Sequence, residues 1–384
     1  MKKSGMKGGI WAVCFTKTGA CLLEKVICRL GLTGIAVEGF YKIREGLDKP
    51  GMLQPVEDSM AAWMGKAFQE ADGILVIGAA GIAVRSAAPW IRDKFTDPAL
   101  VVMDEKGRFV IPLLSGHVGG GNELGKLLAA CTGASLAITT ATDVEQRFAV
   151  DVFAVKRGLW ISSRQRAKEI SADVLAGRPV GIFCAFPQRG EIPGELNRIC
   201  GENDLEEFRG KHLIYLGVKR CRKWERALEE KGGGILYLVP PVLVLGVGCR
   251  KAADPAWVKN QIISCLQAED IWLEAVKTAA TIHRKLEEPA LRKLCEEMNW
   301  ELKGYAAQEL SAVPGTFSDS PFVEQTVGVG NVCERAAVLG SEGGELILPK
   351  QRLQGVTAAV ASKGWILDWK EEVEADRWKD YTHM

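Results

Sequence analysis

The segment that most constrains the fold runs from Val110 to Gly133 and reads VIPLLSGHVGGGNELGKLLAACTG. It starts with an apolar run of strand length, passes through the glycines Gly119 to Gly121, and continues with apolar residues at helical spacing. This order predicts a strand, a glycine-rich loop and a helix. Glycines let a backbone approach a ligand closely, and the first-turn N–H groups of a helix carry partial positive charge. We therefore expect the loop to suit a carboxylate or an oxyanion.

A purely geometric explanation of the same loop stays open, because glycine-rich turns between a strand and a helix are common. His117 favours a functional loop. A histidine between glycines has little apolar cover, and its titration range suits proton transfer.

The composition excludes several classes of protein. The chain has 384 residues, of which 47% are hydrophobic and 25% charged, enough for two or three globular domains. A formal net charge of +1 gives no reason to expect nucleic acid or an anionic membrane as a partner. No apolar stretch reaches transmembrane length, and the 11 cysteines form no CxxC pair. We expect a cytoplasmic protein with neither a disulfide framework nor a metal site.

The N-terminal part repeats one order of elements, which predicts an α/β fold of mostly parallel sheets covered by helices. In such sheets, ligands lie beyond the carboxyl ends of the strands. The expected elements are a strand at Ile10 to Phe15, a turn at Thr16 to Gly19, a helix at Ala20 to Leu30, a strand at Gly73 to Gly78, and a helix from Ile82 that carries Arg85.

A hairpin follows, with strands at Val101 to Met103 and Phe109 to Ile111. Its second strand leads into the loop, and a further strand is expected at Ser135 to Ile138. We expect one edge of the sheet to carry three segments and to form the candidate site: Gly78 to Arg85, Ser115 to Asn122, and Thr139 to Asp143.

A middle segment has expected strands at Val180 to Cys184 and Leu213 to Leu216, on either side of a loop between Pro187 and Gly210. Its basic run, Lys219 to Lys223, indicates a solvated surface, and contact with an acidic ligand stays open as the alternative. A boundary at Pro240-Pro241 completes the expected division into α/β domains at residues 1–150, 151–239 and 240–384.

The last segment opens with a strand at Val242 to Leu245 and the turn Gly246 to Lys251, and Asp254-Pro255 then predicts the start of a helix. Two glycines and two cations before a helix can hold carboxylates, although a plain turn with exposed basic residues explains them equally well. Glu334 lies three residues after Asn331, so the pair forms either a capping box or a substrate-facing group.

These residues, taken in order, resemble the CbiG family, the cobalt-precorrin-5A hydrolases of the anaerobic cobalamin pathway. The N-terminal resemblance rests on Arg85, Pro89, Lys94, Asp97-Pro98, the LLSGHxGGxN pattern ending at Asn122, and TTATD ending at Asp143. The turn Gly246 to Arg250 resembles the GxGCR turn that begins the family's C-terminal domain. Further matches to that domain include Thr281-Ile282, Lys285, Glu288 and Leu348-Pro349-Lys350.

The resemblance implies a particular reaction. Water opens the ring A acetate δ-lactone of a cobalt corrinoid, and C20 leaves with its methyl group as acetaldehyde, giving cobalt-precorrin-5B. The cobalt arrives inside the tetrapyrrole substrate, so no resident cofactor or metal is implied. Transient contacts with neighbouring enzymes of the cobalamin pathway are also implied, and the oligomeric state stays open.

Lactone opening needs a base, oxyanion donors and an acid for the leaving oxygen. On this hypothesis His117 is the base or acid, and Ser115 and Asn122 position water or substrate. Asp143 either orients His117 or a water, or caps the segment after its strand. Ser115 is a poor candidate for a covalent nucleophile, because no G-x-S-x-G elbow surrounds it.

The substrate's acetate and propionate groups call for cations, and we expect Arg85, Arg250, Lys251 and Lys350 to bind them. The other residues expected to contact substrate are Gly116, Gly119, Gly120, Thr140, Gly248 and Glu334.

Two other functions remain as alternatives. A corrinoid-binding carrier without catalysis would use the same cations. A nucleotide-binding transferase fits less well, because GAAGIAVR lacks the dinucleotide-binding spacing and LSGHVGGGNE lacks the lysine and hydroxyl ending of a phosphate loop.

Overall fold

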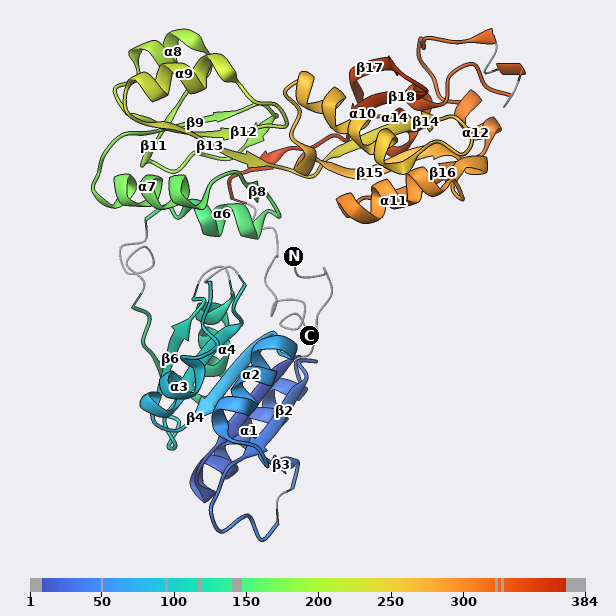
Figure 1. Ribbon diagram of the computed structural model, residues 1–384. Helices are drawn as coiled ribbons and strands as arrows, with labels where there is room; N and C mark the ends of the chain where they lie inside the picture. The colour runs from blue at the N-terminus through green and yellow to red at the C-terminus, as the bar shows by residue number, and fades with distance from the viewer. Residues whose placement is uncertain are drawn as a thin grey trace. The chain divides into compact units, whose positions relative to one another are not determined.

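The computed structural model describes residues 9–49, 51–93, 96–116, 119–139, 147–321, 324–325 and 328–370. The chain divides into two compact units, with the boundary between Lys156 and Arg157. The described residues form three larger sheets and one short two-stranded ladder (Figure 1). The first sheet belongs to the first unit, and the other two belong to the second unit.

The first sheet, blue to teal in Figure 1, is mostly parallel, as the alternating pattern predicts. Strands β1 to β5 run parallel to their neighbours, whereas β6 runs antiparallel to β5, and β7 runs parallel to β6. The β5–β6 pair confirms the predicted hairpin. In spatial order the strands are β3 (Leu53–Pro55), β2 (Val37–Tyr41), β1 (Ile10–Cys14), β4 (Gly73–Ile77), β5 (Ala99–Met103), β6 (Phe109–Leu114) and β7 (Ser135–Leu136).

Helices cover both faces of this sheet. Alternate strand residues point to opposite faces, so Leu75 packs with α1 and α4, and Val76 packs with α2 and α3. Every residue of β4 and β5 is buried, which explains their continuous apolar sequences. The helices of this unit are α1 (Lys17–Gly31), α2 (Met60–Glu70), α3 (Ala80–Ala87), α4 (Gly121–Thr132) and α6 (Val150–Lys156).

Two predicted boundaries in this unit are wrong. Helix α1 begins at Lys17 and not at Ala20, because the Thr16 hydroxyl accepts a hydrogen bond from the Gly19 backbone N–H at 3.1 Å and caps the helix earlier. Strand β7 ends at Leu136, two residues before the predicted end at Ile138.

The second sheet, green to yellow in Figure 1, confirms the predicted strands near Val180 and Leu213. The stretch from Pro187 to Gly210 is not wholly a loop. It contains a short strand that starts at Leu196 and a short helix that includes Leu205, and both leucine side chains are buried. In spatial order the strands are β11 (Leu196–Arg198), β9 (Val180–Cys184), β12 (His212–Leu216), β13 (Gly234–Val239) and the antiparallel β8 (Trp160–Ile161); the helices are α7 (Arg164–Leu175), α8 (Glu202–Glu207) and α9 (Arg222–Glu230).

The third sheet places α10 and α11 on one face and α12 and α14 on the other. Asp254 caps α10 by accepting a hydrogen bond from the Trp257 N–H at 2.8 Å, which confirms the predicted helix start at Pro255. In spatial order the strands are β16 (Glu301–Tyr305), β15 (Val276–Ile282), β14 (Leu243–Cys249), β18 (Val356–Ser362) and β17 (Glu345–Leu353), of which β18 and β17 are antiparallel to their neighbours. The helices are α10 (Pro255–Ala268), η1 (Leu273–Ala275), η2 (His283–Lys285), α11 (Pro289–Met298), α12 (Ala307–Ser311) and α14 (Cys333–Gly340).

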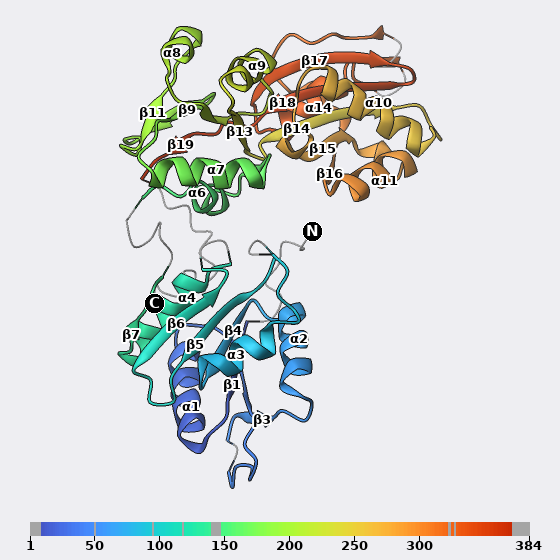
Figure 2. The same ribbon diagram turned by 60° about the vertical axis from the view of Figure 1, so that its left-hand side comes forward.

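The second and third sheets lie side by side in both views (Figures 1 and 2). Trp272 joins them, since its ring lies 5.1 Å from that of Trp160 and 5.2 Å from that of Tyr237. Strand β19 (Leu367–Asp368) also pairs with β10 (Gln188–Arg189). The described part of the chain contains no helix of the length and apolar character needed to span a bilayer.

Candidate active site

The loop after β6 is fastened to the turn that precedes β5. Ser115 is buried and has a φ of 55°, in the left-handed region, and its hydroxyl donates to the Asp97 carbonyl at 3.0 Å. The Asp97 carboxylate in turn accepts the backbone N–H groups of Arg92 (2.8 Å) and Asp93 (3.0 Å). The Ser115 hydroxyl proton is therefore used inside the protein.

The glycines of this loop allow it to fold tightly on itself. A Cβ at Gly119 would overlap the Ser115 Cβ, and a Cβ at Gly116 would lie 2.9 Å from the Asn122 Oδ1. Gly120 precedes α4 with a φ of 81°. Asn122 itself is buried in the first turn of α4. Close packing at Gly116 and Gly119, and the left-handed φ at Gly120, explain why these three positions have no side chain.

Two of the first-turn N–H groups of α4, which were expected to suit an anion, are used inside the loop. The Gly121 N–H donates to the Ser115 carbonyl at 3.0 Å, and the Asn122 N–H donates to the Gly116 carbonyl at 2.8 Å. These bonds close the loop and remove two donors from any oxyanion site at the start of α4.

Three of the predicted site residues lie outside the described residues: His117, Thr140 and Asp143.

The predicted meeting of three segments at one edge of the first sheet is wrong. Because β6 runs antiparallel to β5, with Leu114 opposite Leu100, the Ser115 loop emerges beside the amino ends of β4 and β5. The segment that begins at Gly78 leaves from the carboxyl end of β4. The hairpin therefore sends the Ser115 loop to the opposite edge of the sheet from the segment that begins at Gly78.

Arg85 is consequently separated from the Ser115 loop. Its guanidinium folds back along α3, so that a Cβ at Gly81 would lie 3.4 Å from the Arg85 Nη2. This puts the charge near the start of α3, at the carboxyl edge of the sheet.

A second group of predicted residues lies at the carboxyl end of β14, in the third sheet. Gly248 is in β14, and Arg250 and Lys251 follow it with exposed side chains. The Arg250 N–H donates to the Gly355 carbonyl at 3.1 Å, which ties the turn to the loop between β17 and β18. Since β14 and β15 are parallel, His283 and Lys285 lie at the same edge as Arg250.

Glu288 holds this turn in shape, and the sequence analysis did not propose it as a site residue. Its Oε1 accepts the Ala252 N–H at 2.7 Å, and its Oε2 accepts the Lys285 Nζ at 2.8 Å. Ala252 has a φ of 55°, so the turn needs this support. The Lys285 hydrogen bond, with help from the Ala252 N–H, lowers the pKa of Glu288 although burial raises it. The Lys285-x-x-Glu288-Pro289 spacing before a helix was the available signal.

Glu334 is buried and satisfied by groups of the protein. Its Oε1 accepts the Lys350 N–H at 2.7 Å, and its Oε2 accepts the Ser318 N–H at 2.8 Å as well as the Asn331 Nδ2. The Asn331 Oδ1 accepts the Glu334 N–H at 3.0 Å, which is one half of a capping box. The other half is replaced by bonds to segments distant in sequence, so Glu334 joins α14 to β17 and to residue 318.

Lys350 adds to this junction, because its Nζ donates to the Ser318 carbonyl at 3.2 Å. At the start of helix α14 the Cys333 carbonyl packs against Gly246 of β14, and at its end Gly340 packs against Val244 of the same strand. The N-terminal end of α14 therefore points toward the edge of the sheet where Arg250 lies.

The comparisons with known proteins cover nearly the whole chain. Family models match at residues 62–143 (Cobalamin synthesis G N-terminal), 148–215 (Cobalamin biosynthesis central region) and 243–361 (Cobalamin synthesis G C-terminus). A cobalt-precorrin-5A hydrolase of Salmonella typhimurium is 34% identical over 90% of this chain and 95% of its own length. One from Priestia megaterium is 30% identical over 92% of this chain and 95% of its own length.

A solved structure described as a cobalamin biosynthesis protein G homolog from Sulfolobus solfataricus covers 93% of this chain and 98% of its own, at 19% identity and a TM-score of 0.37. The identity to the Salmonella and Priestia proteins, over nine-tenths of the chain, establishes the family. The chain belongs to the CbiG family of cobalamin-synthesis proteins.

Proposed function

We propose that this chain is a cobalt-precorrin-5A hydrolase. It opens the ring A acetate δ-lactone of cobalt-precorrin-5A with water and releases acetaldehyde to give cobalt-precorrin-5B. The observation that carries the proposal is the identity of 34% and 30% to two proteins of that name over 90% and 92% of this chain. Neither a corrinoid carrier nor a nucleotide-binding transferase is favoured.

The proposed chemistry belongs to the loop between β6 and α4. His117 acts as base or acid, and Asp143 orients it or a water molecule. Ser115 and Asn122 act as positioning residues, which fits the Ser115 bond to Asp97 and the burial of Asn122. With two first-turn N–H groups of α4 already used, the backbone of the loop itself, at Gly116, Gly119 and Gly120, is left to approach the developing oxyanion.

The proposed substrate binding belongs mainly to the third sheet. Arg250 and Lys251 are exposed, and Glu288 holds their turn, so they can bind acetate or propionate groups without rearrangement of the backbone. Gly248, Glu334 and Lys350 complete this group, with Glu334 in a positioning role. The cobalt arrives with the substrate.

The chain works in the cytoplasm on this proposal. All 11 cysteines fall in the described ranges, and each is a free thiol. Free thiols in this number suit a reducing compartment.

The test is to incubate the purified full chain with cobalt-precorrin-5A without oxygen and to measure acetaldehyde. Enzymatic release, together with the mass of cobalt-precorrin-5B, is the expected result. Corrinoid binding without acetaldehyde would replace the hydrolase by the carrier, and absence of both binding and release would refute the proposal.

A further inference from the structure

The second sheet carries a cavity away from the residues discussed so far. Its volume is about 460 Å³, and it lies at the amino ends of β9 and β12. Cavities of this size accept small molecules or one arm of a larger one. The lining residues that matter here are Asp173, Arg178, Phe208, Arg209, Lys211 and Lys231.

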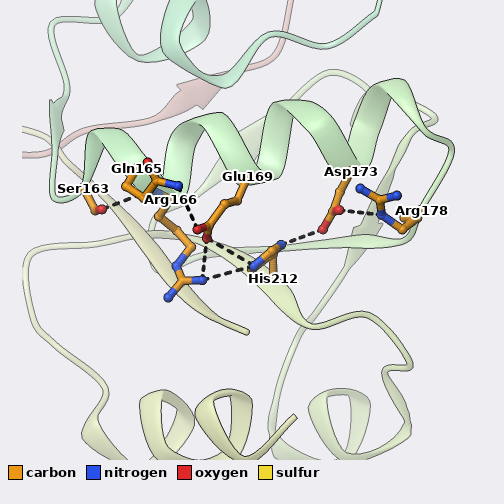
Figure 3. Close-up of polar contacts among 7 residues, drawn as sticks. All are labelled: Ser163, Gln165, Arg166, Glu169, Asp173, Arg178 and His212. Carbon is orange, nitrogen blue, oxygen red and sulfur yellow. Dashed lines mark hydrogen bonds and ion pairs between the residues drawn. The ribbon is translucent and has the colours of Figure 1, made fainter. Parts of the chain in front are cut away.

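Asp173, the one carboxylate of the lining, is neutralised from within the protein (Figure 3). Its Oδ1 accepts the Arg178 Nε at 2.6 Å, and its Oδ2 accepts His212 Nδ1–H at 2.6 Å. Burial raises the pKa of Asp173, but these two bonds outweigh burial and hold the pKa below its ordinary value. Asp173 is therefore ionised and paired near neutral pH.

His212 is itself held in place at 4% exposure. Arg166 donates from Nη1 to its Nε2 at 3.1 Å and from the same nitrogen to the Glu169 Oε2 at 2.7 Å (Figure 3). Since an arginine can only donate, the contact with Arg166 favours the tautomer whose proton is on Nδ1 and points at Asp173. The Glu169 Oε2 lies 3.5 Å from the same Nε2. Hydrogen bonds thus hold both the His212 ring and the Asp173 carboxylate in the wall of the cavity.

The loop on the other side of the cavity is also fixed. Lys231 donates to the carbonyls of Leu205 at 3.2 Å and Phe208 at 2.8 Å, which close the end of α8. A Cβ at Gly210 would overlap the Pro179 carbonyl, so this backbone is packed tightly. Arg209 is held between these two points.

Not all of the cations that line the cavity stabilise the fold. Helices α7, α8 and α9 end near this edge, and cations stabilise helix C-termini. Lys231 is used in that way. Arg209 and Lys211 are exposed, and within the described residues neither has a recorded carboxylate or carbonyl partner.

We propose that this cavity binds a small ligand with more than one carboxylate. Arg178 is paired with Asp173, and Lys231 with two carbonyls, so Arg209 and Lys211 are the lining cations left for a ligand. The planar fork of Arg209 matches carboxylate geometry. Phosphate sites typically add backbone N–H groups at a helix N-terminus, whereas here the helices end and Pro179 has no N–H. The carboxylates come either from the side chains of a corrinoid or from a free polycarboxylate. The free polycarboxylate as a source stands apart from the proposed hydrolase activity, whereas the corrinoid as a source rests on it.

The experiment is calorimetric titration of the full chain with cobyrinic acid, with citrate and with inorganic phosphate. The test variant is R209Q/K211Q, and the matched control is K168Q/K277Q, which removes two exposed positive charges outside the cavity lining. At least one of the two carboxylate probes binds, and R209Q/K211Q weakens it about tenfold, as expected for loss of ion-paired hydrogen bonds. The control binds as the parent does.

Binding of cobyrinic acid alone assigns the carboxylates to a corrinoid, and binding of citrate assigns them to a free polycarboxylate. No binding of either probe, equal affinity in R209Q/K211Q and its control, or tighter binding of phosphate than of both carboxylate probes overturns the proposal. Acetaldehyde release is measured on the same samples. Its failure in the parent chain leaves the binding result intact, so the two proposals fail separately.

Discussion

The loop after β6 and the turn after β14 both join a strand to a helix, but they are closed by different means. In the first, backbone groups bond to each other, and the Ser115 hydroxyl reaches the Asp97 carbonyl. In the second, the Glu288 carboxylate accepts the Ala252 N–H and leaves Arg250 and Lys251 exposed.

On the proposed function, the loop serves the reaction and the turn serves substrate binding. The described part of the first loop has no charged side chain, and its glycines allow a backbone to come close to a reacting group. The second turn offers charge on a fixed backbone, which suits substrate carboxylates. Changes in the loop should therefore lower kcat, and changes in the turn should raise KM.

The largest effect is expected from Gly119→Ala. The new Cβ would overlap the Ser115 Cβ, so the loop must shift, and a displacement of this order near the chemistry lowers kcat about a hundredfold. The matched control is Gly31→Ala, where a Cβ would meet nothing within 4 Å. The measurement is steady-state acetaldehyde release by both variants. Normal kcat in Gly119→Ala would remove the loop from the chemistry.

The double variant R250Q/K251Q tests the other half of the comparison. Loss of both cations is expected to raise KM about tenfold, with kcat nearly unchanged, because two charge-assisted bonds to substrate carboxylates are lost. K168Q/K277Q is again the control for net charge. An unchanged KM would show that this turn binds no substrate, whereas a fall in kcat alone would put the turn in the chemistry.

Glu288→Gln is expected to lower the free energy of unfolding by about 1–3 kcal/mol at pH 7, because the charge-assisted bond to Lys285 is weakened. The pKa of Glu288 is lower in the folded protein than in the unfolded chain. The stabilisation that its ionised carboxylate gives is therefore complete above the ordinary carboxyl pKa of about 4.3, and it is lost as the pH falls through the pKa of the folded protein. Urea unfolding at pH 7 and at lower pH measures this. The difference in unfolding free energy between the parent and the variant should become smaller only in the acid range. A difference that does not depend on pH would mean that the ion pair between Glu288 and Lys285 contributes nothing to stability.

The smallest effect is expected from Arg85→Gln. Arg85 is exposed and lies at the opposite edge of the first sheet from the Ser115 loop, so KM should change by at most about fivefold and kcat should stay the same. Initial rates over a range of substrate concentrations separate the two constants. A large loss of kcat would place Arg85 at the reacting atoms. It would contradict the assignment of Arg85 and the Ser115 loop to opposite edges of the sheet.

Local patterns predicted much of the fold. Apolar runs identified β4, β5, β9 and β12, and the Asp254-Pro255 pair identified the start of α10. Each of these signals lies within a few residues of the element that it predicts. The hairpin also determines the direction of β6, and this reversal places the Ser115 loop at the opposite edge from Gly78, so the predicted single edge was wrong.

The bonds that shape the candidate site were not predictable in the same way. Ser115 reaches Asp97, Glu288 reaches Ala252, and Glu334 reaches Lys350, across 18, 36 and 16 residues of sequence. The tertiary fold determines which residues form these pairs. Local spacing therefore identifies at most one residue of each pair. The Asn331 and Glu334 pair illustrates this, since the near half of the capping box forms and the far half is replaced.

The measurement that tests the central claim most directly compares acetaldehyde release from cobalt-precorrin-5A by the parent chain and by His117→Ala, with circular dichroism as the control for folding. The account predicts release by the parent chain and a kcat lower by about 10²–10⁴ in the variant, the range typical of a lost general acid or base. Equal turnover by both proteins would contradict it, because the loop between β6 and α4 would then supply no proton-transfer group to the reaction.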